Sequence, residues 1–289
     1  MKSTKKFLIL LLTLAMALSL AACGGTKNEA PAALADGGNP SQTTDGADAA
    51  QTADSDLAYV QGKGTLIVGM TDFAPMDYKE EGSDEWIGFD ADMAKAFAES
   101  LGVKAEFIEI NWDNKVFELD GKGIDVVWNG MTLTDDVKAL MGTSEPYCLN
   151  GQVVVLPADK ADQYQTADSL SDLSFAVENG SAGAEQLDAL GIPYTAMDTQ
   201  ARALMEVASG ASDACVIDLL MAGAMIGEGT SYPDLTYTVQ LNSEEYGVGF
   251  RKGSDLVDTF NSFWKEAYDA GTVMETASTY GVQESVIEK

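Results

Sequence analysis

The fold is decided by the stretch TLIVG at residues 65–69 and by the segment that follows it. The β-branched and aliphatic side chains of this stretch favour a buried strand, and a turn-forming region comes next. Apolar residues then recur at helical spacing as far as Gly102, at positions Phe89, Met93, Ala96, Phe97 and Leu101. This order of strand, loop and helix is the unit from which parallel sheets are built.

The same order of elements continues along the chain. Further strands are expected at 105–110 and 124–128, with helices near 115–119 and after Thr134. A second series contains strands at 175–177 and 214–217 and helices at about 181–190, 199–209 and up to Gly227. The sequence therefore predicts an α/β protein with two doubly wound sheets, one in each of two lobes.

Two extended apolar segments separate the two series. Residues 152–156 read QVVVL and residues 246–250 read YGVGF, and we interpret them as hinge crossings between the lobes. The expected lobes are then 57–151 together with 247–289, and 152–246. The closing segment should pack on the first lobe through the core residues Phe260, Phe263, Trp264 and Tyr268.

The first 22 residues have the features of an export signal peptide. Lys2, Lys5 and Lys6 precede a short apolar run that ends at Leu20. The sequence Leu-Ala-Ala before Cys23 resembles the bacterial lipobox, in which the cysteine thiol carries the lipid. Residues 23–56 are rich in small and polar residues, so we expect a disordered tether. We therefore expect an extracytoplasmic lipoprotein anchored to the cell membrane.

Composition excludes several classes of function. The chain has 17 basic and 46 acidic residues, and without the three lysines of the signal peptide the balance is 14 against 46, a net charge of −32. Such acidity argues against a nucleic-acid partner. The chain contains no histidine, and Cys148 and Cys215 lack zinc-type spacing, so we expect no metal, no cofactor and two buried free thiols.

A topological rule selects the candidate site. In open α/β sheets, ligands bind beyond the carboxyl ends of the strands, where helix N-termini and backbone amides face the crevice. The rule selects five segments: Met70 to Phe73, Asn111 to Asn114, Asn129 to Thr132, Glu178 to Gly183, and Asp218. Their aromatic, amide, hydroxyl and acidic residues suit a pocket for a small polar solute.

Several motifs, taken in order, resemble the family 3 solute-binding proteins of amino-acid ABC importers. The likeness covers essentially residues 65–280 and is carried by residues 69–76, 86–90, 123–134, 144–147 and 246–253. The family implies a two-lobed periplasmic-binding-protein-like fold, with two hinge crossings and a ligand between the lobes.

The resemblance also implies roles for individual residues. Phe73 and Trp112 would lie against the two faces of the ligand, Gly130 and Thr132 would donate hydrogen bonds, and Asp218 would hold an α-ammonium. The N-terminus of the helix that Ser181, Ala182 and Gly183 open would meet the α-carboxylate. The complete candidate set is Met70, Asp72, Phe73, Trp112, Asn129, Gly130, Met131, Thr132, Glu178, Ser181, Ala182, Gly183 and Asp218, with no catalytic residue.

The sequence departs from the family pattern at two positions. The family usually has a carboxylate-binding arginine where Val137 stands, and often an acid where Met70 stands, so an ammonium partner is expected at Asp72 or Glu178 instead. The groups that could replace the arginine are Lys115, Lys138, Arg202, the amide of Asn129 and the helix N-termini. Alternatively the ligand lacks a free α-carboxylate, and the acids around the crevice favour a positively charged solute.

These observations predict a substrate-binding lipoprotein that captures a small polar solute, an amino acid in the first instance, by hinge closure. It would deliver the solute to the permease subunits of an ABC importer, act as a monomer and have no enzymatic activity. The alternatives are a receptor for an amine or another non-amino-acid solute, an enzyme similar to cyclohexadienyl dehydratase, a sensor ectodomain or a structural lipoprotein.

Overall fold

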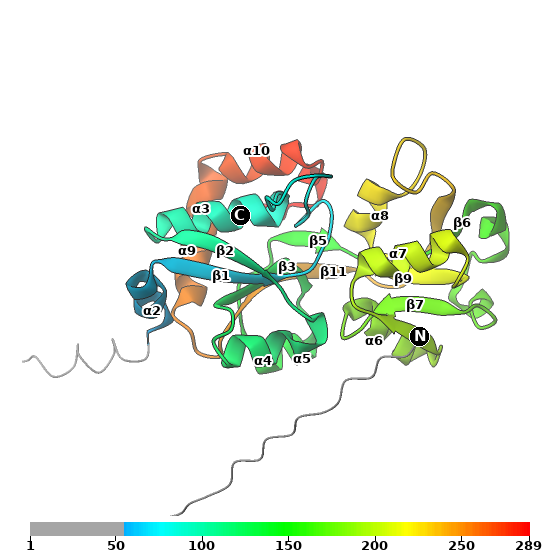
Figure 1. Ribbon diagram of the computed structural model, residues 1–289, viewed down its shortest axis with the longest axis horizontal. Coiled ribbons are helices and arrows are strands. Elements are labelled where there is room, and N and C mark those ends of the chain that lie inside the picture. The colour runs from blue at the N-terminus through cyan, green and yellow to red at the C-terminus, as the bar shows by residue number, and fades with distance from the viewer. Residues whose placement is uncertain (1–54) are drawn as a thin grey trace, which may run out of the picture. The chain divides into compact units, whose positions relative to one another are not determined.

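Two separate β-sheets organise residues 55–289, the part of the chain that the computed structural model describes (Figure 1). The first sheet has the order β2-β1-β3-β11-β4, with β5 paired to β11. Its strands are β1 (Thr65–Met70), β2 (Lys104–Glu109), β3 (Val126–Thr132), β4 (Gly142–Thr143), β5 (Cys148–Asn150) and β11 (Glu244–Phe250). Strands β1, β2 and β3 run parallel, whereas β11 is antiparallel to β3.

The second sheet has the order β10-β6-β9-β7-β8. Its strands are β6 (Gln152–Pro157), β7 (Phe175–Glu178), β8 (Tyr194–Met197), β9 (Ala214–Asp218) and β10 (Leu235–Gln240). Strands β7, β8 and β9 are parallel, and β6 is antiparallel to both of its neighbours. Each sheet therefore combines parallel strands with antiparallel ones, and the predicted α/β class is confirmed.

Helices flank both sheets (Figure 1). Those associated with the first sheet are α2 (Asp56–Lys63), α3 (Phe89–Ser100), α4 (Lys115–Asp120), α5 (Asp135–Leu140), α9 (Leu256–Asp269) and α10 (Thr272–Thr279). Those associated with the second are α6 (Ala182–Leu190), α7 (Gln200–Ser209) and α8 (Leu219–Met225). The 3₁₀ turns are η1 (Trp112–Asn114), η2 (Ala158–Gln163), η3 (Ala167–Ser169) and η4 (Gln283–Ser285). Within residues 55–289, every helix is too short or too polar to span a membrane.

The chain passes between the two sheets twice, at places that differ from the predicted ones. Both apolar segments interpreted as crossings are strands within a sheet, β6 and β11. The connections themselves are shorter: Gly151 joins β5 to β6, and residues 241–243 join β10 to β11. The return to the first sheet thus precedes Tyr246, which pairs there with Thr132. In each case the connection is short and lies just before the apolar run, and the run itself forms the next strand. The apolar pattern in the sequence does not separate the two.

The predicted signal peptide 1–22, Cys23 and nearly all of the tether 23–56 lie outside the described residues. Asp56, the last residue assigned to the tether, is instead the first residue of α2. The Ser55 hydroxyl caps this helix by accepting a hydrogen bond from the Ala58 amide at 3.0 Å. The folded part therefore begins before the predicted boundary.

The closing segment packs on the first sheet as predicted. Phe260 and Trp264 of α9 are buried, and the Phe260 ring lies edge-on to Trp128 of β3 at 4.9 Å between ring centroids. Gly271, with φ +85°, separates α9 from α10, so the segment forms two helices. The thiols of Cys148 and Cys215 are buried and free, as expected.

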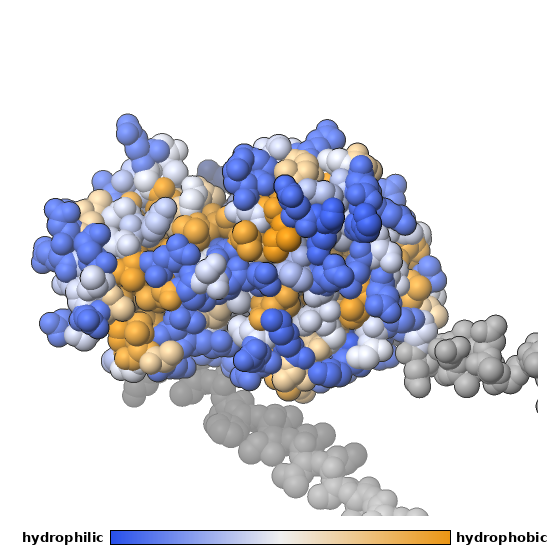
Figure 2. Space-filling view, turned by 180° about the vertical axis from the view of Figure 1, so that it is seen from behind, coloured by the Kyte–Doolittle hydropathy of each residue, from blue (hydrophilic) through white to orange (hydrophobic). Residues whose placement is uncertain are grey.

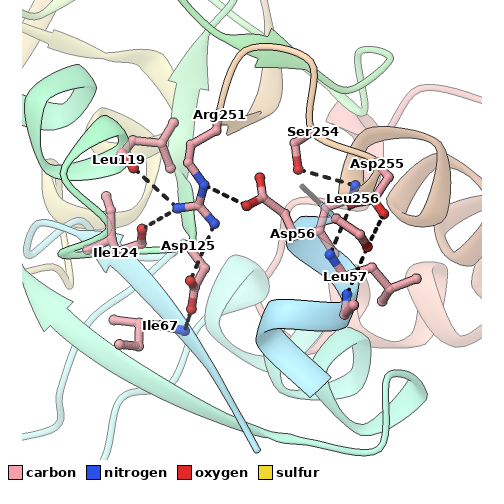
Figure 3. A network of polar contacts seen from close by, with 12 residues as sticks. Asp56, Leu57, Ile67, Leu119, Ile124, Asp125, Arg251, Ser254, Asp255 and Leu256 are labelled. Atoms are coloured by element: carbon pink, nitrogen blue, oxygen red, sulfur yellow. Dashed lines mark hydrogen bonds and ion pairs between the residues drawn. The ribbon is translucent and has the colours of Figure 1, made fainter. Parts of the chain in front are cut away.

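A buried ion-pair network attaches α2 to the first sheet (Figure 3). The Arg251 side chain donates through Nε to Asp56 Oδ1 at 2.9 Å, and its second terminal nitrogen lies 3.6 Å from Asp125 Oδ1. It also donates to the carbonyl oxygens of Leu119 and Ile124. Lys63 pairs with the other oxygen of Asp125. Both buried acids of this network are thus matched by cations.

Most of the surface seen from behind is hydrophilic, with separate hydrophobic areas between (Figure 2). Phe117 of α4 is the most exposed of the large apolar side chains among the described residues, at 74%. Isolated exposed apolar residues of this kind are normal on soluble domains. The exposed apolar residues therefore do not mark a site. The carboxyl ends of the parallel strands, where ligands bind in open α/β sheets, make the space between the two sheets the place to look for one.

Candidate functional site

One cavity lies between the two sheets and is lined in equal number by residues of both; we call it the central cavity. Including its opening to solvent, the space between its lining atoms is about 430 Å³. The first sheet and its helices contribute Trp112, Lys115, Asn129, Gly130, Met131, Thr132, Thr134 and Val137. The second contributes Gln152, Glu178, Gly180, Ser181, Ala182, Glu185, Gln200 and Asp218. Of this space, only about 30 Å³ is a cavity in the strict sense, so the two sides of the site are nearly closed on each other in this conformation.

Strand ends bring these residues together. Asn129 to Thr132 close β3, Glu178 closes β7 and Asp218 closes β9, all at carboxyl ends of parallel strands. Helix α6 begins at the same edge, where the Ser181 hydroxyl caps it by accepting a hydrogen bond from the Ala184 amide at 3.2 Å. The α6 N-terminus therefore lies at the cavity with its positive dipole end.

Asp218 is a buried acid whose oxygens already accept hydrogen bonds from side-chain amides. Oδ1 accepts from Asn150 and, at 2.6 Å, from Gln152, while Oδ2 accepts from Gln200. The Asn150 and Gln152 amides also donate to Glu244 Oε1, at 2.6 and 2.7 Å. Burial, and after it the negative charge of Glu244, raises the pKa of Asp218 to about 8.

Glu178 is a second buried acid in the cavity, with different surroundings. It is 2% exposed, and no residue in 55–289 donates a hydrogen bond to its Oε1. Burial, and then the charge of Asp218, raises the pKa of Glu178 to about 8, although the positive charge of Lys115 acts in the opposite direction. Perturbed acids in a cavity mark a functional site.

Lys115 joins the two sides of the cavity. Its Nζ donates to the carbonyl oxygens of Trp112, at 3.2 Å, and of Gly180 in the second half, at 3.0 Å. It also lies 4.9 Å from the centre of the Trp112 ring, a cation–π distance. Burial lowers the pKa of Lys115. Its ammonium is therefore held mainly by carbonyl groups and an aromatic ring.

On the side of the first sheet, the hydrogen-bond donors expected to contact a ligand already donate to other groups of the protein. The Gly130 amide donates to Asp90 Oδ2 at 2.7 Å, and the Thr132 hydroxyl donates to Glu244 at 3.0 Å. The Asn129 side-chain amide donates to the Thr71 carbonyl and to Asp77, both within 3.0 Å. In this conformation, these groups shape the cavity wall more than they offer hydrogen bonds to a solute.

Comparison with known proteins identifies the family. The model of the bacterial extracellular solute-binding proteins, family 3, matches residues 66–283, which is most of the chain. The protein belongs to this family.

Individual proteins named for binding an amino acid resemble this chain over most of their length. The L-cystine-binding protein TcyJ of Escherichia coli (strain K12) is 29% identical over 221 residues, 75% of this chain and 82% of that protein. The arginine-binding extracellular protein ArtP of Bacillus subtilis (strain 168) is 29% identical over 280 residues, 92% of this chain and 94% of that protein.

A solved structure and an enzyme also match. The structure of holo ArgBP from T. maritima is 32% identical, with a TM-score of 0.67, and the match covers 73% of this chain and 93% of that one. The cyclohexadienyl dehydratase of Pseudomonas aeruginosa is 29% identical over only 122 residues, 42% of this chain and 45% of that protein. The proteins named for binding an amino acid are thus matched over the greater length.

Four candidates from the family pattern do not line the central cavity. Phe73 is 2% exposed and belongs to the hydrophobic core, where it lies edge-on to Tyr246 at 6.4 Å. A Cβ atom on Gly130, whose φ is +56°, would lie 2.5 Å from the Phe73 ring. The missing side chain thus lets the Phe73 ring pack directly beneath Gly130, which lines the cavity.

The other three are displaced for separate reasons. Met70 is completely buried at the end of β1. Asp72 lines a different hollow, with Tyr78, Lys79 and Met225. Gly183 lies behind the wall: a Cβ there would come within 2.9 Å of Gln152 and Val216, so the glycine permits close packing of α6 on the second sheet.

The family arginine is absent from the cavity as well as from the sequence motif. Val137 lines the wall at that position, and Lys115 is the only Lys or Arg among the lining residues of the described chain. Lys138 lines an adjoining hollow, and Arg202 is exposed on α7. Of the proposed cationic replacements, Lys115 alone reaches the cavity wall.

Sequence reasoning did not assign Gln152, Glu185 and Gln200 to the site, although all three line the cavity. Gln152 begins the antiparallel strand β6 and pairs with Asp218, so its first residue meets the carboxyl ends of the parallel strands. Gln200 begins α7 directly after β8, a strand that the sequence analysis missed. Extending the strand-end rule to the starts of antiparallel strands would have selected Gln152 and Glu244.

Proposed function

We propose that this protein is the substrate-binding lipoprotein of an ABC importer. It would capture an amino acid between two lobes, close around it by rotation at the two crossings, and deliver it to permease subunits in the membrane. The lobes would be residues 55–150 with 244–289, and 152–240. Lipid on Cys23 would hold the protein at the outer face of the membrane.

The observation that carries this proposal is the shared lining of the central cavity. Neither half can enclose a solute alone, because Trp112 and Thr132 come from one half and Ser181 and Asp218 from the other. The N-terminus of α6 would bind a carboxylate, since the amides of its first turn point out of the helix. The buried acids would bind an ammonium by charge-assisted hydrogen bonds.

The direct test is to identify a solute that copurifies with the protein. Mass spectrometry of small molecules released by gentle denaturation should detect an amino acid, and calorimetric titration with that solute should give saturable binding of one molecule per chain. Absence of binding by any amino acid or amine would overturn the proposed function.

A matched variant tests the site itself. Asp218→Ala should weaken solute binding by roughly tenfold or more, because it removes a buried acceptor and leaves the amides of Asn150, Gln152 and Gln200 with one acceptor fewer. Circular dichroism should show an unchanged fold. An unchanged dissociation constant would remove Asp218 from the binding site.

An enzyme similar to cyclohexadienyl dehydratase is the second candidate. Glu178, with a pKa of about 8, could hold a proton at neutral pH inside the cavity, as a general acid must. Incubation with a cyclohexadienyl acid such as prephenate distinguishes the two functions. Loss of the acid at a rate that Glu178→Gln abolishes would support the enzyme, and stoichiometric binding without turnover would support the receptor.

A further inference from the structure

The charges that line the central cavity are unequal in number. Three carboxyl groups line it, those of Glu178, Glu185 and Asp218, and Glu244 shares the amide donors of Asp218. The opposing cation among the lining residues is Lys115. A cavity of this composition has a strongly negative electrostatic potential when its acids are ionised.

Lys115 does not neutralise this group. Its Nζ donates to two backbone carbonyl oxygens and forms no ion pair with Glu178 or Asp218 within 4.0 Å. Its pKa is lowered by burial, which weakens it further as a permanent counter-charge. When these acids are ionised, the described residues therefore leave most of their negative charge without an ion-pair partner.

Glu178 differs from Asp218 in what its oxygens contact. Asp218 accepts hydrogen bonds from three side-chain amides, which is close to the capacity of a carboxylate. Glu178 is equally buried, yet its Oε1 accepts none from residues 55–289. An unsatisfied buried acceptor costs free energy, so its retention in a cavity wall indicates a partner that arrives with the ligand.

We infer that the solute of this site is a net cation, and that an ammonium or guanidinium group of the solute pairs with the Glu178 carboxylate. This inference rests on the proposed function and names its substrate class. A zwitterionic neutral amino acid brings no net charge to the three acids, whereas a basic amino acid or a diamine does. The Glu178 side chain then determines specificity, and the α6 N-terminus accepts a carboxylate when the solute has one.

The experiment compares solutes that have the same shape and different charge. Calorimetric titration of the purified protein uses arginine against citrulline and lysine against norleucine, with cadaverine as a cation that lacks a carboxylate. Glutamine and glutamate complete the panel. We expect the cationic member of each pair to bind roughly tenfold or more tightly than its neutral counterpart.

Two Glu-to-Gln variants test whether the preference for a cationic solute depends on Glu178. Glu178→Gln should reduce the affinity for the cationic solute by roughly 30-fold and remove most of the difference within each pair. Glu228→Gln, at an exposed position in the second half and outside the central cavity, should leave both unchanged. Thermal unfolding of both variants checks that they fold.

The outcomes separate the inference from the proposed function. Tightest binding of a neutral or acidic amino acid would overturn the inference and leave the receptor function standing, as would a cation preference that survives in Glu178→Gln. Failure of every amino acid and amine to bind would overturn the receptor function, and with it the inference. Binding of cadaverine as tight as that of lysine would show that no carboxylate is required.

Discussion

Two sets of buried carboxyl groups in this protein have opposite surroundings. In the first, Asp56 and Asp125 lie 2.9 and 3.6 Å from nitrogen atoms of Arg251 (Figure 3), and Lys63 lies 2.5 Å from Asp125. In the second, Glu178 and Asp218 lie in the central cavity without an ion pair to a described residue, and burial raises their pKa values to about 8. The first set holds α2 on the first sheet, and the second lines the proposed binding site.

The difference separates a structural role from a functional one. The protein itself supplies the ion-pair partners of the first set. These acids therefore contribute to stability and to the position of α2, and they need no ligand. Buried acids without such cations reduce stability as long as they are ionised, and a cationic ligand that binds beside them would compensate for this. Substitutions in the two sets should therefore have effects of opposite sign.

The largest change in stability should follow from removing Arg251, the cation that contacts both acids of the first set. Arg251→Met leaves Asp56 and Asp125 buried with one cation between them, and it should lower the free energy of unfolding by about 3 to 5 kcal/mol. Urea denaturation measures this change. Arg202→Met, at an exposed position on α7, is the control and should change stability by less than about 0.5 kcal/mol. Equal effects of the two substitutions would contradict the assignment.

A smaller pair of effects should have opposite signs. Asp125→Asn weakens the contacts to Lys63 and Arg251 and should destabilise by about 1 to 3 kcal/mol, whereas Glu178→Gln should stabilise the ligand-free protein by about 1 to 3 kcal/mol at pH 8. Because the folded pKa of Glu178 is raised above 4.5, the wild type should lose stability relative to Glu178→Gln as pH rises from about 4.5 to 8. Thermal unfolding across this range measures the difference, and a pH-independent difference would contradict it.

The smallest effect is the release of protons on binding. A cation stabilises the ionised form of Glu178, so binding below pH 8 should release up to about one proton, and affinity should rise between pH 6 and 8. Asp218 and Glu185, whose pKa values are also raised, add to the release, and loss of the Lys115 proton acts in the same direction. Calorimetry in buffers of different ionisation enthalpy counts the protons. Glu178→Gln should release fewer, and an equal number in the variant would argue against Glu178.

Much of the fold could be predicted because its buried strands are continuous apolar runs. The runs at β1, β3, β6, β7 and β9 mark the centres of both sheets. Strand β8 could not be found in this way, since its four residues are only partly buried or exposed at the edge of the second sheet. Because β8 was not predicted, Gln200, which follows this strand at the start of α7, was not recognised as a residue at a strand end.

The candidate site was predictable where backbone topology alone places a residue. Trp112, Thr132, Ser181 and Asp218 line the cavity because strand ends and helix starts bring them there. Phe73 does not line the cavity in this conformation, because its ring occupies the space that Gly130 leaves, a property of three-dimensional packing. The same holds for Gly183, which serves the contact between α6 and the second sheet.

The crossing at Gly151 has a consequence for how the protein could signal its state. Asn150 and Gln152 stand on either side of this residue, in different sheets, and both donate to Asp218 and to Glu244. Any swing of one sheet away from the other pulls one of these amides from the carboxyl it serves. Water that reached Asp218 on opening would lower its raised pKa, so separation of the two halves would favour release of the Asp218 proton at the pivot.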